Sequence, residues 1–243
     1  MSSATTAVAL VTNTADRMGQ ETARRLAAKG QTVILGVRDI QSGQPILDEL
    51  LQQEQSAELL VLDATQQTSV DAAADNLRSR FGRLDILINN HSLALDKGPL
   101  NQAPVEDLIA TYEANLFGTF RCIQAFVPLL KLSSNPRVVN ISSSLGSVMN
   151  MTDKRSPYYE AAQPLYASSK AALNVLTIHL ARELKEAGIK VNAVDPGIMD
   201  PRLPDGDPES IMETAASAPV RYALIGENGP SGGFFDRLGP IPW

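Results

Sequence analysis

The stretch Val8-Ala9-Leu10-Val11-Thr12-Asn13-Thr14-Ala15-Asp16-Arg17-Met18-Gly19 decides the class of fold. Its first four residues are continuously apolar, which is typical of a short strand buried on both faces. A turn follows, and then Ala23, Leu26 and Ala27 recur at the spacing of one helix face, up to Gly30. A buried strand, a turn and a helix in this order favour a fold with parallel strands.

The same alternation of strand and helix continues along the rest of the chain. The further segments predicted as strands are 32–35, 59–62, 84–88, 137–141, 190–194 and 233–235. Helical spacing lies between them, around 47–51, over 70–81, from about 105 to 130 and from 166 to 187. Thr68 and Asp71 resemble a capping box before the second of these helices, and Pro128 is expected to disturb the last turns of the third.

These elements predict an α/β fold, a doubly wound parallel sheet with helices on both faces. A chain of 243 residues is compatible with one such domain, so residues 1–243 are predicted as a single domain. Its ligand is expected at the carboxyl ends of the strands. Residues 200–231 are rich in Pro, Gly, Asp and Glu and are interpreted as a flap over that site.

Composition excludes several classes of partner. Lys and Arg total 21 against 27 Asp and Glu, so the net charge of −6 predicts no nucleic-acid and no membrane partner. The single cysteine, Cys122, excludes an internal disulfide and a cysteine-based metal cluster, and no metal site is predicted. The apolar run 7–11 is too short for a membrane span and lacks the basic start of a signal peptide. A cytoplasmic location is predicted.

Tyr166 and Lys170 form the strongest chemical pair in the sequence. Their spacing of four, within Tyr-Ala-Ser-Ser-Lys, places both side chains on one helix face. Tyrosine has a pKa near 10, and a neighbouring ammonium favours its phenolate and brings it into use in acid–base chemistry. Spacing alone leaves open an ordinary exposed pair.

At two further polar positions, a functional role competes with an ordinary structural one. Ser142-Ser143-Ser144 follows the fifth predicted strand, where a hydroxyl would meet a substrate oxygen, but serines are also common where strands become loops. Asn115 lies within a helical stretch although asparagine is a mediocre helix former, so a polar role competes with a plain surface position.

The order of these residues resembles the short-chain dehydrogenase/reductase family over nearly the whole chain. Asn115, Ser143, Tyr166 and Lys170 stand where that family has its catalytic tetrad. The other matching segments are Asp63, Asn89-Asn90, Val-Asn-Ile-Ser-Ser at 139–143 and Pro196-Gly197. The tail, Gly-Pro-Ser-Gly-Gly-Phe-Phe-Asp at 229–236 and Pro-Ile-Pro-Trp at 240–243, is similar to the carbonyl-reductase branch.

The resemblance implies a Rossmann-like fold and a division of roles. Tyr166 would exchange a proton with the substrate oxygen, Lys170 would lower its pKa and hold the nicotinamide ribose, and Ser143 would bind the substrate oxygen. Asn115 would position a water linking Lys170 to solvent. The cofactor-binding residues that the resemblance implies are Thr12, Asn13, Arg17, Met18, Gly19, Arg38, Asp63, Asn90, Tyr166, Lys170, Pro196 and Gly197.

The cofactor turn departs from the family pattern Thr-Gly-x-x-x-Gly-x-Gly. Asn13 and Arg17 replace two glycines, and Gly19 remains. Asn13 can still adopt a left-handed conformation, whereas Arg17 stands where the backbone approaches the pyrophosphate. His91 replaces a small residue beside the cofactor path, and it is either a new ligand group or a loop histidine with no assigned task. Pro201 replaces a threonine.

Two segments bear on substrate and cofactor choice. Residues 145–163 are predicted as an insertion near the mouth of the site, whose Met149, Met151, Tyr158 and Tyr159 either line an apolar pocket or form a packed surface excursion. Arg38, after the second strand, would pair with a 2′-phosphate, although the adjacent Asp39 would weaken that preference or neutralise Arg38.

The sequence predicts an NADPH-dependent oxidoreductase that reduces a small carbonyl compound to an alcohol. Its altered cofactor turn leaves an alternative: the family fold acting as a cofactor-independent enzyme or as a ligand-binding or regulatory protein. The oligomeric state is left open between a monomer and a homo-oligomer.

Overall fold

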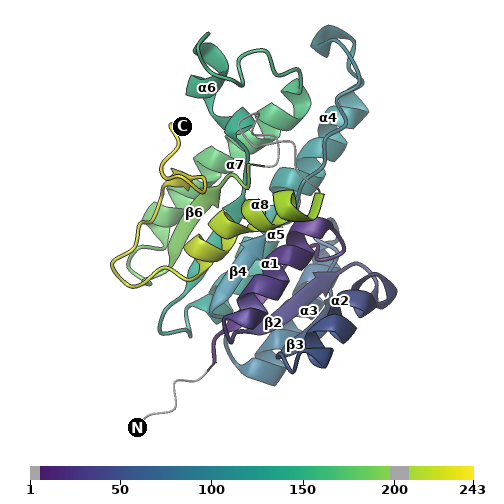
Figure 1. Ribbon diagram of the computed structural model, residues 1–243, viewed down its shortest axis with the longest axis vertical. Helices are drawn as coiled ribbons and strands as arrows, with labels where there is room; N and C mark the ends of the chain where they lie inside the picture. Colours follow the sequence, from purple (N-terminus) through teal and green to yellow (C-terminus); the bar gives the residue numbers. More distant parts are fainter. Residues whose placement is uncertain (1–5, 198–207) are drawn as a thin grey trace.

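The computed structural model describes residues 6–197 and 208–243 (Figure 1). Seven parallel strands form one sheet in the order β3-β2-β1-β4-β5-β6-β7. Their bounds are β1 Val8–Val11, β2 Thr32–Val37, β3 Ala57–Val61, β4 Ile86–Asn89, β5 Arg137–Ile141, β6 Lys190–Val194 and β7 Phe234–Phe235. The chain builds outward from β1 to β3 and then returns through β4 on the other side, which confirms the predicted doubly wound parallel sheet.

Helices cover both faces of this sheet (Figure 1). Their bounds are α1 Arg17–Ala28, α2 Ile40–Gln52, α3 Gln67–Phe81, α4 Val105–Tyr112, α5 Gly118–Leu130, α6 Val148–Thr152, α7 Pro164–Glu183 and α8 Pro208–Ala223. One face is packed by α1, α2 and α8, with Leu26 and Ile46 buried in its core. The other is packed by α3, α5 and α7, with Leu77, Phe126 and Leu180 buried. Strands buried on both faces explain the continuous apolar runs.

Three helix predictions are corrected by the structure. The capping box at Thr68 and Asp71 is wrong, because α3 begins at Gln67 and no side chain caps it. The expected helix 105–130 is divided by η2, a π-helical turn at Glu113–Phe117, while Pro128 lies within α5 and leaves it intact to Leu130. The helix expected over 166–187 is α7, which starts earlier and ends at Glu183.

The segment 200–231 contains a helix that the sequence did not reveal. Residues 200–207 of the predicted flap, Pro201 among them, lie outside the described residues. From Pro208, helix α8 packs beside α1, and its Ala215, Ala216 and Ala218 are buried. This part of the segment is therefore helical and packs in a layer of the fold.

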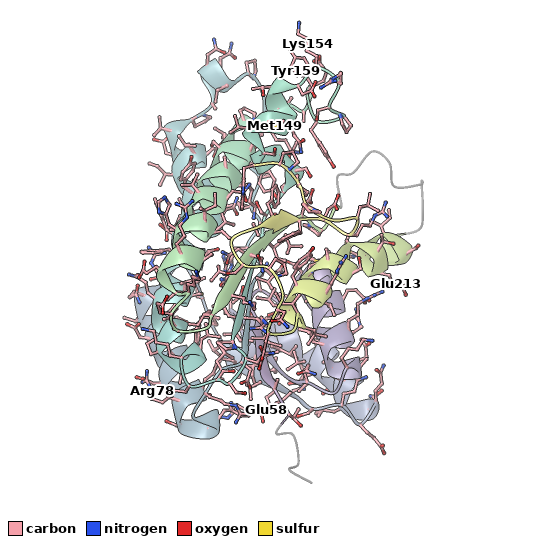
Figure 2. All side chains as sticks on the ribbon, turned by 90° about the vertical axis from the view of Figure 1, so that its left-hand side faces the viewer. Glu58, Arg78, Met149, Lys154, Tyr159 and Glu213 are labelled. Carbon is pink, nitrogen blue, oxygen red and sulfur yellow. The ribbon has the colours of Figure 1, made fainter. Side chains whose placement is uncertain are left out.

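Residues 145–163 lie at one end of the molecule. They contain η3, a short turn at Ser144–Gly146, and α6. Tyr158 is buried against Leu145 and Ala167, while Met149 and Tyr159 are exposed at the end of the molecule opposite Glu58 and Arg78 (Figure 2). These positions favour the packed surface excursion over the apolar pocket.

Candidate active site

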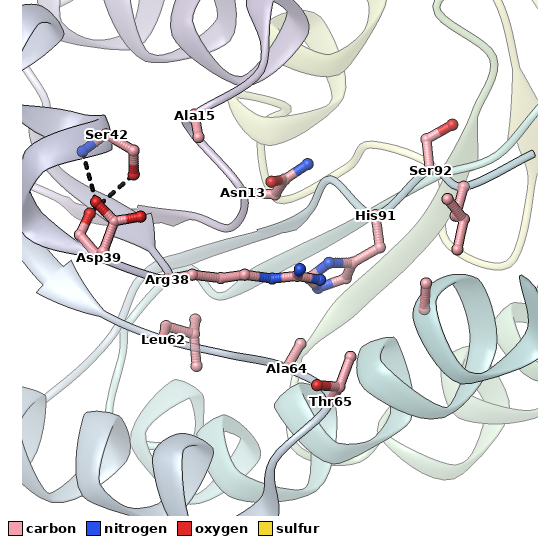
Figure 3. A pocket seen from close by; sticks show the side chains of 12 residues that line it. Asn13, Ala15, Arg38, Asp39, Ser42, Leu62, Ala64, Thr65, His91 and Ser92 are labelled. Carbon is pink, nitrogen blue, oxygen red and sulfur yellow. Dashed lines mark hydrogen bonds between the residues drawn. The ribbon is translucent and has the colours of Figure 1, made fainter. Parts of the chain in front are cut away.

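The carboxyl ends of β1, β4, β5 and β6 surround two neighbouring cavities. The first, of about 350 Å³, is lined by Asp16, Arg17, Met18, Asn90, Ser92, Ala94, Ile141, Ser142, Ser143, Gln163, Tyr166, Asp195, Pro196 and Met212. The second, of about 410 Å³, is lined by Asn13, Ala15, Arg38, Asp39, Ser42, Leu62, Ala64, Thr65, His91, Ser92, Leu93 and Ala114 (Figure 3). We call them the tyrosine cavity and the arginine cavity. Ser92 lines both, so the two cavities adjoin at the switch point between β1 and β4.

Tyr166 and Lys170 lie on the side of α7 that faces the sheet. The Tyr166 hydroxyl is 3.4 Å from Ser92 Oγ, and Lys170 Nζ is 5.5 Å from the centre of the tyrosine ring. Lys170 is fully buried, and its Nζ donates hydrogen bonds to the carbonyl oxygens of His91 (2.7 Å) and Ile141 (2.8 Å). The alternative of an ordinary exposed pair is therefore wrong.

Burial shifts the pKa values of both groups. It raises the pKa of Tyr166, as does the carboxylate of Asp195, while hydrogen bonding with Ser92 and Ser143 opposes the rise. Burial lowers the pKa of Lys170 to about 7, with Asp195 acting in the opposite direction. A buried group that titrates near neutral pH beside a phenol is typical of acid–base sites.

The three serines after β5 have different surroundings. The Ser142 hydroxyl donates to Asn174 Oδ1 at 2.6 Å, and the Ser144 hydroxyl and backbone N–H both donate to Asp195. Ser143 Oγ accepts a hydrogen bond from the Leu145 N–H at 3.2 Å, and the Ser143 side chain also hydrogen-bonds with Tyr166. Ser143 is thus the serine suited to hold a ligand oxygen in the tyrosine cavity.

Asn115 is buried within η2, and the surface alternative for it is wrong. Its Oδ1 accepts from the Leu93 N–H at 2.7 Å, and its Nδ2 donates to the Leu93 carbonyl oxygen and to Ser169 Oγ. These bonds tie the segment after β4 to α7. Asn115 therefore positions the segment that carries Ser92 relative to Tyr166.

The turn between β1 and α1 keeps the shape that its glycines would provide. Asn13 has a φ of 52°, in the left-handed region that glycine favours. A Cβ at Gly19 would lie 2.6 Å from the Asn13 carbonyl oxygen and 2.9 Å from Thr14 Cα, so no other residue fits there. Thr12 Oγ1 accepts from the Asn90 N–H at 2.9 Å and holds the turn against the end of β4.

Asp16 is a residue of this turn that sequence reasoning missed. It caps α1, and its Oδ1 accepts from the Gly19 N–H at 2.8 Å. Asn13 Nδ2 donates to its Oδ2 at 2.6 Å, and Asn90 Nδ2 donates to both oxygens. Burial raises the pKa of Asp16, against the hydrogen bonds. An aspartate directly before a helix is the pattern of a cap and was the available signal.

Arg38 extends across the arginine cavity toward His91 (Figure 3). Its Nε lies 3.8 Å from Asp63 Oδ1, and its side chain is 68% exposed. Asp39 instead caps α2 by accepting from the Ser42 N–H at 2.8 Å. Burial lowers the pKa of His91 to about 3, assisted by the charge of Lys170, so its ring is neutral near pH 7.

The remaining predicted residues are divided between the cavities and other parts of the structure. Met18, Arg17 and Pro196 line the tyrosine cavity, and the Gly197 N–H donates to Asp195 at 2.7 Å. Asp63 accepts hydrogen bonds from the Thr65 side chain and N–H below the arginine cavity.

Comparison with known proteins identifies the family. The family model described as short chain dehydrogenase matches residues 7–209, so the chain belongs to this family of oxidoreductases. The chain is 32% identical to a (-)-isopiperitenone reductase of Mentha piperita, over 94% of this chain and 96% of that protein. It is also 32% identical to a (+)-neomenthol dehydrogenase of Arabidopsis thaliana, over 98% of each.

A solved structure gives the same assignment. The structure of an NADPH-bound carbonyl reductase from chicken fatty liver superimposes with a TM-score of 0.81 at 26% identity, covering 98% of each chain. Among residues 6–197 and 208–243, no helix combines the length and apolar character that a membrane span requires.

The buried ammonium predicts a pH dependence of stability. The pKa of Lys170 is about 7 in the folded protein and about 10.4 in an unfolded chain. Between these values the unfolded chain holds a proton that the folded protein has released, so this group makes the unfolding free energy rise with pH. Burial of the charged ammonium lowers the unfolding free energy by its full amount below pH 7. This destabilisation becomes smaller as the pH rises toward 10.

We therefore expect the unfolding free energy of Lys170→Met, relative to that of the wild type, to be highest at pH 7. This relative stability should fall progressively as the pH rises to 10. Denaturant unfolding at several pH values measures this difference in unfolding free energy, with the exposed Lys185→Met as a control for the loss of one lysine. A difference between Lys170→Met and the wild type that stays constant over this range would contradict the buried-charge assignment.

Proposed function

We propose that the protein is an NADPH-dependent reductase that converts a small carbonyl compound to an alcohol. One observation carries this proposal: Tyr166 and Ser143 line the same cavity, and the buried Lys170 lies beneath the tyrosine ring. A hydroxyl that donates a proton, a second hydroxyl that orients the substrate and a cation behind them form a general acid site.

The residues have distinct roles in this reaction. NADPH would supply the hydride. Ser143 donates its hydroxyl hydrogen to the substrate oxygen, and Tyr166 transfers its proton to the same oxygen as negative charge develops there. Lys170 stabilises the resulting phenolate electrostatically. Asn115 keeps Ser92 and α7 in place through its bonds to Leu93 and Ser169.

The two adjoining cavities fit a dinucleotide in most respects. The tyrosine cavity would take the nicotinamide half, and the arginine cavity would take the adenosine half beside Arg38. The turn between β1 and α1 lies between them and includes Gly19, where a Cβ would clash with the backbone. The N-terminus of α1 provides N–H groups for a pyrophosphate. Asp16 disagrees with such a ligand, because its carboxylate already accepts from the Gly19 N–H at this position.

The charge of Arg38 supports a preference for NADPH over NADH. Its guanidinium is exposed in the arginine cavity, whereas the neighbouring Asp39 is held by the N–H of Ser42. A planar guanidinium suits a phosphate, and a carboxylate that caps a helix is withdrawn from competing for Arg38. NADPH is also the cofactor named for the chicken carbonyl reductase structure.

The walls of the tyrosine cavity support a neutral carbonyl substrate. Ala94, Ile141 and Met212 form apolar walls, and Gln163 adds an uncharged polar group. An anionic substrate would meet the carboxylate of Asp195 in the same cavity. The names of the mint and Arabidopsis relatives indicate a reductase and a dehydrogenase of small organic molecules, which agrees with this class.

A tyrosine variant tests the proton donor. Tyr166→Phe removes one phenolic oxygen, which lies 3.4 Å from Ser92 Oγ. We expect kcat for reduction of a neutral ketone with NADPH to fall by roughly 10²-fold or more, the usual contribution of a positioned general acid. Thermal stability and NADPH affinity should change little. Tyr159→Phe, on the exposed segment, is the matched control, and wild-type kcat in Tyr166→Phe would refute the assignment.

An arginine variant tests cofactor preference. Arg38→Ala removes the cation of the arginine cavity, so KM for NADPH should rise roughly tenfold or more while KM for NADH changes little. Steady-state kinetics with both cofactors measures the ratio, and Arg78→Ala on α3 controls for net charge. An unchanged ratio of NADPH to NADH efficiency would show that Arg38 does not bind the 2′-phosphate.

A further inference from the structure

The carboxylate of Asp16 lies at the N-terminus of helix α1, where the first N–H groups have no partner within the helix. The Gly19 N–H, one of those groups, donates to Asp16 Oδ1 at 2.8 Å. Asn13 Nδ2 and Asn90 Nδ2 donate to the same carboxylate, at 2.6 Å and at 3.1 to 3.2 Å. Donors from α1, from the turn before it and from the end of β4 therefore converge on one anion that belongs to the protein itself.

This carboxylate also lies on the border between the two cavities. Asp16 lines the tyrosine cavity together with Arg17, and Asn13, which donates to it, lines the arginine cavity. A dinucleotide that reaches from Arg38 to Tyr166 has to pass this border with its pyrophosphate. The donors bound to Asp16 are thus the ones nearest to the path of the pyrophosphate.

We propose that Asp16 is an internal competitor of the cofactor pyrophosphate, so that NADPH binds by displacing this carboxylate from the N-terminus of α1. The proposal rests on the proposed function, since it concerns the same cofactor site. It names Asp16 as a determinant of cofactor affinity. Two anions cannot share one donor set at hydrogen-bond distance without repulsion, so affinity is lower than the donors alone would provide.

Asn90 has a second contact that makes the displacement feasible. Its Nδ2 donates to the Asn13 carbonyl oxygen at 3.2 Å as well as to Asp16. When the carboxylate leaves, this amide keeps a partner, and the Gly19 N–H becomes free for phosphate oxygens. Asp16 is half-buried and at the cavity wall, so its side chain can turn toward solvent.

The variant Asp16→Asn separates competition from capping. Asparagine caps helices about as well as aspartate, so α1 keeps its partner for Gly19. The substitution removes the negative charge, and it also replaces one of the two oxygens that accept from Asn13 Nδ2 and Asn90 Nδ2 with an NH2 group. We expect the melting temperature of the unliganded protein to stay within a few degrees, and the dissociation constant for NADP⁺ to fall on the order of tenfold, the effect of one partly screened charge repulsion. Asp16→Ser, another capping residue, provides a second variant with the same expectation.

Isothermal titration calorimetry with NADP⁺ and with adenosine 2′-phosphate measures both binding and its location. Adenosine 2′-phosphate has no pyrophosphate, so its affinity should be equal in Asp16→Asn and the wild type. Asp75→Asn, an exposed aspartate on α3, changes the net charge equally and should leave NADP⁺ affinity unchanged.

The outcomes distinguish this inference from the proposed function. If the wild type binds NADP⁺ and Asp16→Asn and Asp16→Ser bind it equally or more weakly, the competition is refuted and the reductase assignment stands. If only the Asp16 variants bind NADP⁺, the competition is supported and the wild type is not a working reductase. If none binds at millimolar NADP⁺, both the competition and the cofactor assignment fail.

Discussion

The ammonium group of Lys170 joins the three elements that form the active site. From α7 it reaches the carbonyl oxygens of His91 after β4 and of Ile141 at the end of β5, so one buried cation fixes the helix of Tyr166 against two strands. Burying a cation is costly, and two carbonyl partners offset part of that cost. The lowered pKa of Lys170 is the consequence of this burial.

Much of the fold was predictable because strands buried on both faces give continuous apolar runs, as in Val8–Val11. Helix α8 was not, because most of its buried residues are alanines, such as Ala215 and Ala218, and the larger buried side chains, Val220 and Tyr222, lie only in its last turns. The π-helical turn at Glu113–Phe117 also escaped prediction, since the contacts that bury Asn115 come from distant segments.

The sequence likewise revealed some residues of the candidate site and not others. Tyr166 and Lys170 were predicted to share one helix face because their spacing is local, their roles were implied by the family resemblance, and the structure places them together. Asp16 was not singled out, since its importance depends on Asn90, 74 residues away in the chain. Local pattern thus finds the candidate acid–base pair, whereas the contacts around the start of α1 join residues far apart in the chain. His91 is a bulky residue of the arginine cavity, and its surroundings also come from segments far apart in the chain.

In the proposed function, the arginine and tyrosine cavities form a single dinucleotide site. A crystal structure of the protein grown with NADP⁺ tests it most directly. The predicted result has the adenosine 2′-phosphate beside Arg38, the nicotinamide in the cavity of Tyr166 and Ser143, and the Asp16 carboxylate turned away from the Gly19 N–H. A dinucleotide bound elsewhere, or cavities that stay without it at saturating NADP⁺, would contradict the account.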